Sequence, residues 1–283
     1  MVTGAEAGAG GAPFAGRVAV VTGASRGMGR AIALRLARDG ADCVVMYRRD
    51  AARAGEAVAA IERLGRRALA LALDLGEPAE VAPAFARIGE VFGRVDVFVA
   101  NAAATAFRPT LEQKRHNLQR TFAISVESFV AAVQAAVPLM RGRPGRVVAV
   151  SGIDSQQAMA RHGALGAAKA ALESLVRVLA MELGPLGITV NGVSPGLVET
   201  DSAQFYVERG ISREYTEAVK RIIALTPVRR AGTGEDVAAL VAYLASDAAG
   251  FLTGQTIVID GGLTILSPLN LMQADPASGA GAP

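Results

Sequence analysis

Cysteine, histidine and aromatic residues are scarce in this chain, and each scarcity removes a class of site. Its single cysteine, Cys43, excludes both a disulfide framework and a cysteine-based zinc site. Only two histidines, His116 and His162, are available, which argues against a multi-histidine metal centre, so we expect no metal. Cys43 opens the apolar run Cys43–Met46, which predicts a buried packing residue in a reducing compartment, the cytoplasm.

Long apolar runs and clustered charge are missing as well. No stretch approaches the 18 consecutive apolar residues of a membrane span, so we expect no membrane partner. The Gly/Ala-rich segment 1–15 shows no basic start followed by an apolar block, which argues against a secretory signal and predicts a disordered arm. The net charge is only +3 and the arginines are scattered, which argues against a nucleic-acid surface.

The stretch around which the chain is organised lies near its start. The apolar run Val18–Val21 has the pattern of a strand buried on both faces, and Gly23, Gly27 and Gly29 follow it at the spacing Gly-x-x-x-Gly-x-Gly. An Ala-rich helix comes next. Glycines here allow a tight turn and a close approach of backbone N–H groups to a pyrophosphate at the helix N-terminus. The pattern therefore predicts a dinucleotide site, with a simple strand–helix turn as the alternative.

Strands and helices alternate along the rest of the chain. We expect strands at 18–21, 42–47, 68–73, 95–100, 146–150, 188–193 and 256–260, and helices at 31–38, 51–64, 79–92, 118–140 and 163–183. Such alternation predicts a Rossmann-type α/β fold, a single three-layer domain with a doubly wound parallel sheet of seven strands. We place this domain at 16–263, with a polar-aromatic substrate lid at 201–225 and a tail at 264–283.

Three further segments carry a resemblance. They are Asn101-Ala102-Ala103 followed by Arg108-Pro109, the stretch Gly166–Glu173, and the stretch Gly254–Gly262. With the glycine spacing, they resemble the short-chain dehydrogenase/reductase family, and most closely its branch of type III enoyl-acyl-carrier-protein reductases. The resemblance covers nearly the whole chain, from about Gly16 to Leu263. It implies a reductase that binds a nicotinamide cofactor.

The cofactor is expected to be NADP(H). An acid at the tip of the second strand would accept a hydrogen bond from the adenosine ribose, whereas arginine accommodates a 2′-phosphate. Here the tip is Tyr47-Arg48, with no acid before Asp50, and Arg26 lies in the glycine turn; a solvated arginine pair is the alternative. With the positions implied by the resemblance, the cofactor-binding set is Gly23, Ser25, Arg26, Gly27, Met28, Arg48, Asp74, Leu75, Asn101, Ala102, Ala103, Lys169, Pro195, Val198 and Thr200.

The family's acid–base residues are mostly absent. Relatives carry a catalytic tyrosine four or, in the enoyl reductase branch, seven residues before the lysine; here these positions are Leu165 and His162. Seven helical steps return to within about 20° of the lysine and four to within about 40°, so either position can face the same pocket. The usual serine position is Gly152, and the usual asparagine position is Ser125. Only Lys169 is retained.

His162 is the leading replacement for the tyrosine, because an imidazole can donate a hydrogen bond to an enolate or alkoxide. Its place at a helix N-terminus disfavours the imidazolium, and a surface or capping role is the alternative. Ser125 and Ser151 are candidate polarising hydroxyls. Asp154 is interpreted as a turn former or, less favoured, a loop acid. His116 lies in a polar run and is expected to be solvated.

These observations favour a cytoplasmic NADPH-dependent reductase of an activated C=O or C=C in a polyketide, quinone or acyl-type substrate. Such substrates form stabilised enolates or phenolates and suit specialised metabolism, such as antibiotic biosynthesis. Two alternatives remain open: a non-redox isomerase, cyclase or dehydratase, and an NADPH-binding regulatory protein. The resemblance also implies a homodimer or homotetramer, joined through the helices at 118–140 and 163–183.

Overall fold

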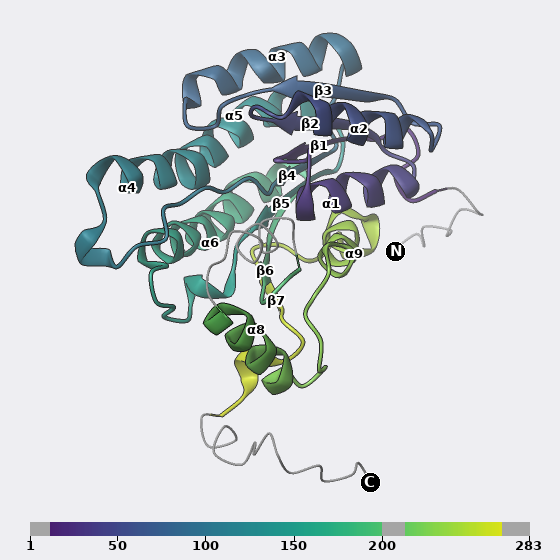
Figure 1. The fold of residues 1–283 in the computed structure, drawn as a ribbon. Coiled ribbons are helices and arrows are strands. Elements are labelled where there is room, and N and C mark those ends of the chain that lie inside the picture. Colours follow the sequence, from purple (N-terminus) through teal and green to yellow (C-terminus); the bar gives the residue numbers. More distant parts are fainter. Residues whose placement is uncertain (1–11, 200–212, 268–283) are drawn as a thin grey trace, which may run out of the picture.

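Seven parallel strands form one sheet in the computed structural model, which describes residues 12–199 and 213–267. The strands lie in the order β3-β2-β1-β4-β5-β6-β7 (Figure 1). Their bounds are β1 Val18–Thr22, β2 Asp42–Tyr47, β3 Ala68–Ala72, β4 Val97–Ala100, β5 Gly145–Val150, β6 Ile188–Pro195 and β7 Thr256–Ile259. The doubly wound, Rossmann-type sheet expected from the sequence is confirmed.

Helices cover both faces of the sheet (Figure 1). Their bounds are α1 Gly27–Arg38, α2 Ala51–Glu62, α3 Val81–Phe92, α4 Arg115–Phe122, α5 Ser128–Met140, α6 Gly163–Leu183, α8 Arg213–Leu225 and α9 Gly234–Ala245. Side chains of α1, α2 and α9 share one apolar core with the sheet, and those of α3, α5 and α6 share a second. Every residue of β1, β5 and β6 is buried, as expected of central strands that helices cover on both faces of a parallel sheet.

The helical stretch Arg115–Met140 contains a π-helical turn, η3, at Ala123–Glu127, between α4 and α5. By length and composition this stretch, alone among the described residues, could cross a membrane, a test that a core helix also passes. Phe129, Val133 and Met140 lie in the second apolar core, against the sheet. We therefore interpret it as a helix of the domain core. The helix starts three residues earlier than the sequence indicated.

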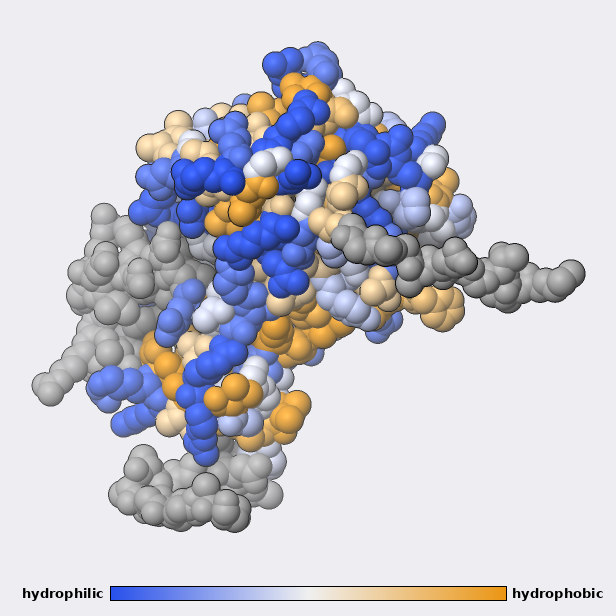
Figure 2. All heavy atoms as spheres, turned by 90° about the vertical axis from the view of Figure 1, so that its right-hand side faces the viewer, coloured by the Kyte–Doolittle hydropathy of each residue, from blue (hydrophilic) through white to orange (hydrophobic). Residues whose placement is uncertain are grey.

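Helix α9 is an element that the sequence expectations lack. It packs against α1 beneath the glycine turn, on the right of Figure 1. Val237, Val241 and Leu244 of α9 are buried in the same core as Ile32 and Leu36 of α1. In Figure 2, which faces these helices, hydrophilic side chains cover most of the upper surface, and hydrophobic ones gather in the lower half.

The first part of the proposed lid, 201–212, falls outside the described residues, as do the arm at 1–11 and the tail beyond 267. Its last part is α8, which lies beyond β7 at the lower end of the molecule (Figure 1). The assignment of a substrate lid therefore stays a prediction.

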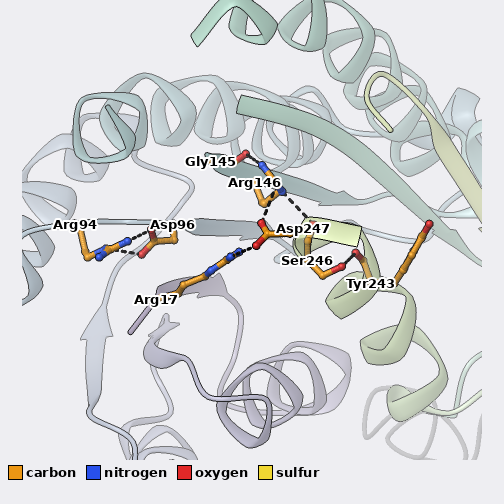
Figure 3. Close-up of polar contacts among 8 residues, drawn as sticks. All are labelled: Arg17, Arg94, Asp96, Gly145, Arg146, Tyr243, Ser246 and Asp247. Carbon is orange, nitrogen blue, oxygen red and sulfur yellow. Dashed lines mark hydrogen bonds and ion pairs between the residues drawn. The ribbon is translucent and has the colours of Figure 1, made fainter. Parts of the chain in front are cut away.

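Charged residues gather at the amino-terminal edge of the sheet (Figure 3). Arg146, at the start of β5, is buried, and its guanidinium donates to Asp247 at 3.2 Å and to the carbonyl oxygens of Gly145 and Ser246. Arg17, before β1, bonds the other oxygen of Asp247. This cluster joins three segments that are far apart in the sequence, and it lies at the edge of the sheet opposite the glycine turn.

Candidate functional site

The glycine turn lies where the sheet order reverses, between β1 and β4. Ligands of doubly wound sheets bind at such a point, outside the carboxyl ends of the strands. Gly23 and Gly27 have φ of +64° and +54°, which side chains rarely allow. A Cβ on Gly29 would lie 2.3 Å from the carbonyl oxygen of Gly23 and 2.5 Å from the Asn101 amide nitrogen. Each glycine of the motif is therefore required by the local geometry.

Side-chain hydrogen bonds fix the ends of β1 and β4 to each other. Thr22 Oγ1 accepts from the backbone N–H groups of Asn101 at 2.9 Å and of Ala102 at 3.0 Å. Asn101 Nδ2 donates to the carbonyl oxygen of Thr22 at 2.9 Å. These hydrogen bonds hold the carboxyl ends of β1 and β4 together at the point where a ligand would bind.

The N-terminus of α1 suits an anion. Arg26 precedes the helix in extended conformation, and no side chain caps the first N–H groups. The first turn carries no acid, whereas Arg35 and Arg38 lie in the last turn. Free N–H groups and the positive end of the helix dipole together attract a phosphate.

A cleft of about 630 Å³ opens beside this turn. Eleven of the proposed cofactor residues line it: Gly23, Ser25, Arg26, Gly27, Met28, Arg48, Asp74, Leu75, Asn101, Ala102 and Ala103. The glycine cradle, the uncapped helix and two arginines fit a dinucleotide that carries phosphates. The residues therefore match the cofactor class implied by the sequence.

Asp74 has a partner that the sequence did not indicate. Arg120 of α4 donates to both of its carboxylate oxygens, at 3.1 and 3.0 Å. Burial raises the pKa of Asp74, but the Gly76 N–H and the Arg120 guanidinium outweigh it and hold that pKa below its usual value. Asp74 thus stays ionised at the rim of the cleft and ties α4 to the end of β3.

Lys169 lines a small cavity that shares Leu75 and Ala102 with the wall of the cleft. Its side chain is buried on α6, and Nζ donates to the carbonyl oxygen of Val150 at 2.5 Å. Burial lowers the pKa of Lys169 to about 8, against the opposing charges of Asp154 and Glu173. Ser125, in the π-helical turn, lines the same small cavity as Lys169. Among the described residues, Ser125 Oγ has no hydrogen-bond partner although it is buried, so it is available to a ligand.

Ser151 is directed elsewhere. It is buried after β5, and its hydroxyl donates to Glu173 at 2.6 Å, as does that of Ser155. Gln156 donates to the second carboxylate oxygen of Glu173, at 3.3 Å. Glu173 was missed by the sequence analysis, although it lies one helical turn after Lys169 and on the same face of α6. The proton of Ser151 is therefore engaged, and a polarising role for this hydroxyl stays a prediction.

His162, just before α6, pairs with Asp154. Its Nδ1 lies 3.1 Å from Asp154 Oδ2, and its ring packs on that of Phe107, with 4.7 Å between the centroids. Phe107 and Leu165 line the large cleft, whereas His162 and Asp154 line a neighbouring cavity of about 520 Å³. The histidine thus lines the neighbouring cavity rather than the cofactor cleft, whose wall it contacts through Phe107. The structure also gives Asp154 a side-chain partner beyond the turn that it helps to form.

The remaining cofactor candidates follow β6. Pro195 ends that strand and is buried, and Val198 forms an isolated parallel bridge with Gly232. Thr200 lies outside the described residues. His116 lies at the start of α4.

Comparison with known proteins identifies the family. Residues 23–264 match the model described as Enoyl-(Acyl carrier protein) reductase. The chain belongs to the short-chain dehydrogenase/reductase family. It is 40% identical over 252 residues to 1-cyclohexenylcarbonyl-CoA reductase of Streptomyces collinus, covering 89% of this chain and 88% of that one.

Two other members show the range of the family. A tetrahydroxynaphthalene reductase of Pestalotiopsis fici is 32% identical over 88% of this chain and 92% of its own. A short-chain dehydrogenase of Burkholderia cenocepacia, solved with NADP, superposes with a TM-score of 0.81 at 35% identity, over 89% of this chain and 99% of that one. The chain described here is accordingly an oxidoreductase. The replacement of the family's tyrosine and serine by His162 and Gly152 stays a prediction.

Proposed function

We propose that this enzyme uses NADPH to reduce a C=C bond conjugated to an acyl thioester, in a pathway of specialised metabolism. The observation that carries the proposal is a cleft lined by eleven of the proposed cofactor residues, which shares Leu75 and Ala102 with the small cavity around the buried Lys169, in a chain that lacks the tyrosine. The likeness to a reductase named for cyclohexenylcarbonyl-CoA supports the thioester. NADP in a similar structure, with Arg26 and Arg48 in the cleft here, supports the choice of cofactor.

The chain's own residues would hold the cofactor and manage the proton. The first turn of α1 and Arg26 would bind the pyrophosphate, Arg48 would bind the 2′-phosphate, and Lys169 would hold the nicotinamide ribose. The nicotinamide supplies a hydride. A hydride added to the β carbon of the substrate leaves a thioester enolate, whose oxygen needs only a hydrogen-bond donor. His162, with a hydrogen on both ring nitrogens, is our candidate for the group that delivers the proton to the α carbon, which completes the saturated thioester.

The test is consumption of NADPH with a panel of cyclic and acyclic enoyl thioesters, quinones and hydroxynaphthalenes. We expect the enoyl thioesters to be reduced, and His162→Ala and Lys169→Ala each to lose most of the rate. His116→Ala is the matched control, because it removes the other histidine of the chain, and its rate should stay that of the wild type.

Two results would contradict the proposal. If NADPH binds but no compound of the panel is reduced, the isomerase, cyclase, dehydratase or regulatory interpretation takes its place. If only hydroxynaphthalenes are reduced, the substrate bond is a carbonyl, as the name of the Pestalotiopsis relative suggests.

We also propose a cytoplasmic homodimer or homotetramer. Only 39% of the apolar window within Arg115–Met140 is buried inside one chain, and Val178 and Met181 on α6 are exposed. Ala131, Ala135, Ala171 and Leu175 are half-buried on these helices and allow close packing, while Ala132 and Ala168 are already buried within the chain. Light scattering after size-exclusion chromatography would give the mass, and that of a monomer would contradict the proposal.

A further inference from the structure

We infer that Asp154 is the positioning residue for His162, and that its carboxylate occupies the space that a side chain at Gly152 would need. This inference rests on the proposed function for the catalytic part played by His162. It gives a function to Gly152, which otherwise only marks the absence of the family's serine, and to Asp154, which otherwise only forms a turn.

The space argument comes from the backbone. A Cβ at Gly152 would lie 2.7 Å from Asp154 Oδ1, closer than a Cβ atom approaches a neighbouring heavy atom, so the carboxylate would have to move. A Cβ at Gly166 would lie 2.3 Å from the carbonyl oxygen of Asp154, so that glycine lets α6 press against the turn η4, Ile153–Ser155. Gly152 thus leaves room for the Asp154 carboxylate, and Gly166 allows α6 to pack closely against the backbone of the turn.

The Asp154 carboxylate then determines which ring nitrogen of His162 carries a hydrogen. An ionised carboxylate only accepts hydrogen bonds, so the ring nitrogen facing Asp154, Nδ1 at 3.1 Å, must carry its hydrogen there. Asp154 is only 8% exposed in its side chain and the histidine 27%, so water competes weakly for this bond. In the described part of the chain, Nε2 has no hydrogen-bond partner.

Two further contacts complete the arrangement. The Phe107 ring flanks the imidazole and limits its rotation. The charges of Lys169 and Asp154 attract each other, so the carboxylate interacts electrostatically with both bases. The family's serine and tyrosine positions are therefore replaced together: glycine admits the aspartate, and the aspartate orients the histidine.

The experiment reads the histidine ring directly. With two histidines in the chain, His116→Asn and His162→Asn assign both sets of ring nitrogens by NMR. In the folded wild type we expect a protected Nδ1 proton on His162. Asp154→Ala should abolish it, and Asp154→Asn, which still accepts a hydrogen bond, should retain it in part. Gly152→Ala should weaken it by displacing the carboxylate. Gly55→Ala and Glu90→Gln, at an open helix position and on an exposed helix face, are the matched controls.

Kinetics gives the second readout. We expect Asp154→Ala to lower kcat about tenfold or more, and Asp154→Asn to lower it less, with KM for NADPH unchanged in both. A wild-type Nδ1 that is unprotonated or unprotected overturns the inference whether or not the protein reduces anything. If Asp154→Ala abolishes the Nδ1 signal without changing kcat, the positioning role is overturned, whereas the proposed reductase activity is not contradicted. Absence of turnover in the wild type with the signal present refutes the proposed function alone.

Discussion

A buried lysine is the residue on which this site depends most. Lys169 hydrogen-bonds a strand carbonyl and shares its surroundings with two carboxylates, Asp154 and Glu173. Its amine loses hydration through burial, which lowers its pKa to about 8 from an ordinary value of 10.5. Lys169 therefore loses its proton near pH 8 in the folded protein and near pH 10.5 in the unfolded chain.

This difference predicts how stability depends on pH. Between about 8 and 10.5 the unfolded chain holds a proton on Lys169 that the folded chain has released, so the unfolding free energy rises across this window. Below pH 8 both states are protonated and this rise is absent. We expect a gain of up to about 3 kcal/mol from pH 8 to 10.5.

Denaturant titration of the wild type and of Lys169→Met at several pH values measures this gain. The difference between the two proteins isolates Lys169, because Cys43 contributes equally to both. Burial raises the pKa of Cys43 to about 12 from 9.0, so that thiol contributes stability that is lost as pH rises above 9. Parallel pH profiles in the two proteins would contradict the prediction.

Arg48 predicts the cofactor preference. A charge-assisted hydrogen bond to a 2′-phosphate contributes about 1.5–3 kcal/mol, which corresponds to about 10-fold or more in affinity. We therefore expect Arg48→Ala to raise KM for NADPH at least about tenfold and to leave KM for NADH within about twofold. Arg63→Ala, on the exposed end of α2, serves as the control. Equal effects on both cofactors would show that Arg48 does not read the phosphate.

At the scale of residues, the sequence indicated local features better than contacts between segments. The glycine turn and Lys169 were recognisable because spacing along the chain defines them. The pairs Asp74–Arg120, Ser151–Glu173 and His162–Asp154 were not predicted. Asp74–Arg120 joins the loop after β3 to a helix of a later crossover, whereas the other two pairs lie within the single connection from β5 into α6. No residue spacing along the chain encodes these side-chain contacts, because they depend on how the loop folds back on the helix.

At the scale of elements, all seven strands were predictable, because short apolar runs bounded by turns alternate regularly with longer helical segments along the chain. Helix α9 was missed although its signals are present in the sequence. Val237, Leu240, Val241 and Leu244 recur at helical spacing, and Thr233 with Asp236 forms a capping box. The π-helical turn that carries Ser125 has no such signal, because packing against the sheet decides it.

The capping box predicts a measurable share of stability. Thr233 Oγ1 accepts from the Asp236 N–H at 3.1 Å, and Asp236 Oδ2 accepts from the Thr233 N–H at 2.8 Å. Thr233→Ala removes one half of this exchange and should lower the unfolding free energy by about 1 kcal/mol. Thr233→Ser should retain it. Chemical denaturation compares the three proteins, and a serine variant as unstable as the alanine variant would refute the capping role.

At the scale of the whole molecule, the amino-terminal charge cluster joins the first strand, the fifth strand and the segment after α9 (Figure 3). Asp247→Ala leaves Arg146 buried without its carboxylate. The side chain of Asp247 is 65% exposed, so we expect a loss of about 1–2 kcal/mol rather than the 3–5 of a fully buried pair.

The double variant Arg146→Met/Asp247→Ala tests the cause of that loss. It removes the unpaired charge and should recover part of the lost stability, as followed by thermal denaturation. Further destabilisation of the double variant would show that Arg146 contributes through its bonds to the Gly145 and Ser246 carbonyls instead.

The packing of α1 against α9 has a consequence for the protein during its synthesis. Roughly 200 residues separate the two helices, which a ribosome adds in about 10–40 s at 5–20 residues per second. Throughout that interval Ile32 and Leu36 have no α9 to cover them, although the glycine turn and the first strands have already emerged. The nascent chain thus carries an uncovered apolar face beside its future cofactor site, and a chaperone that binds apolar segments has its longest opportunity there.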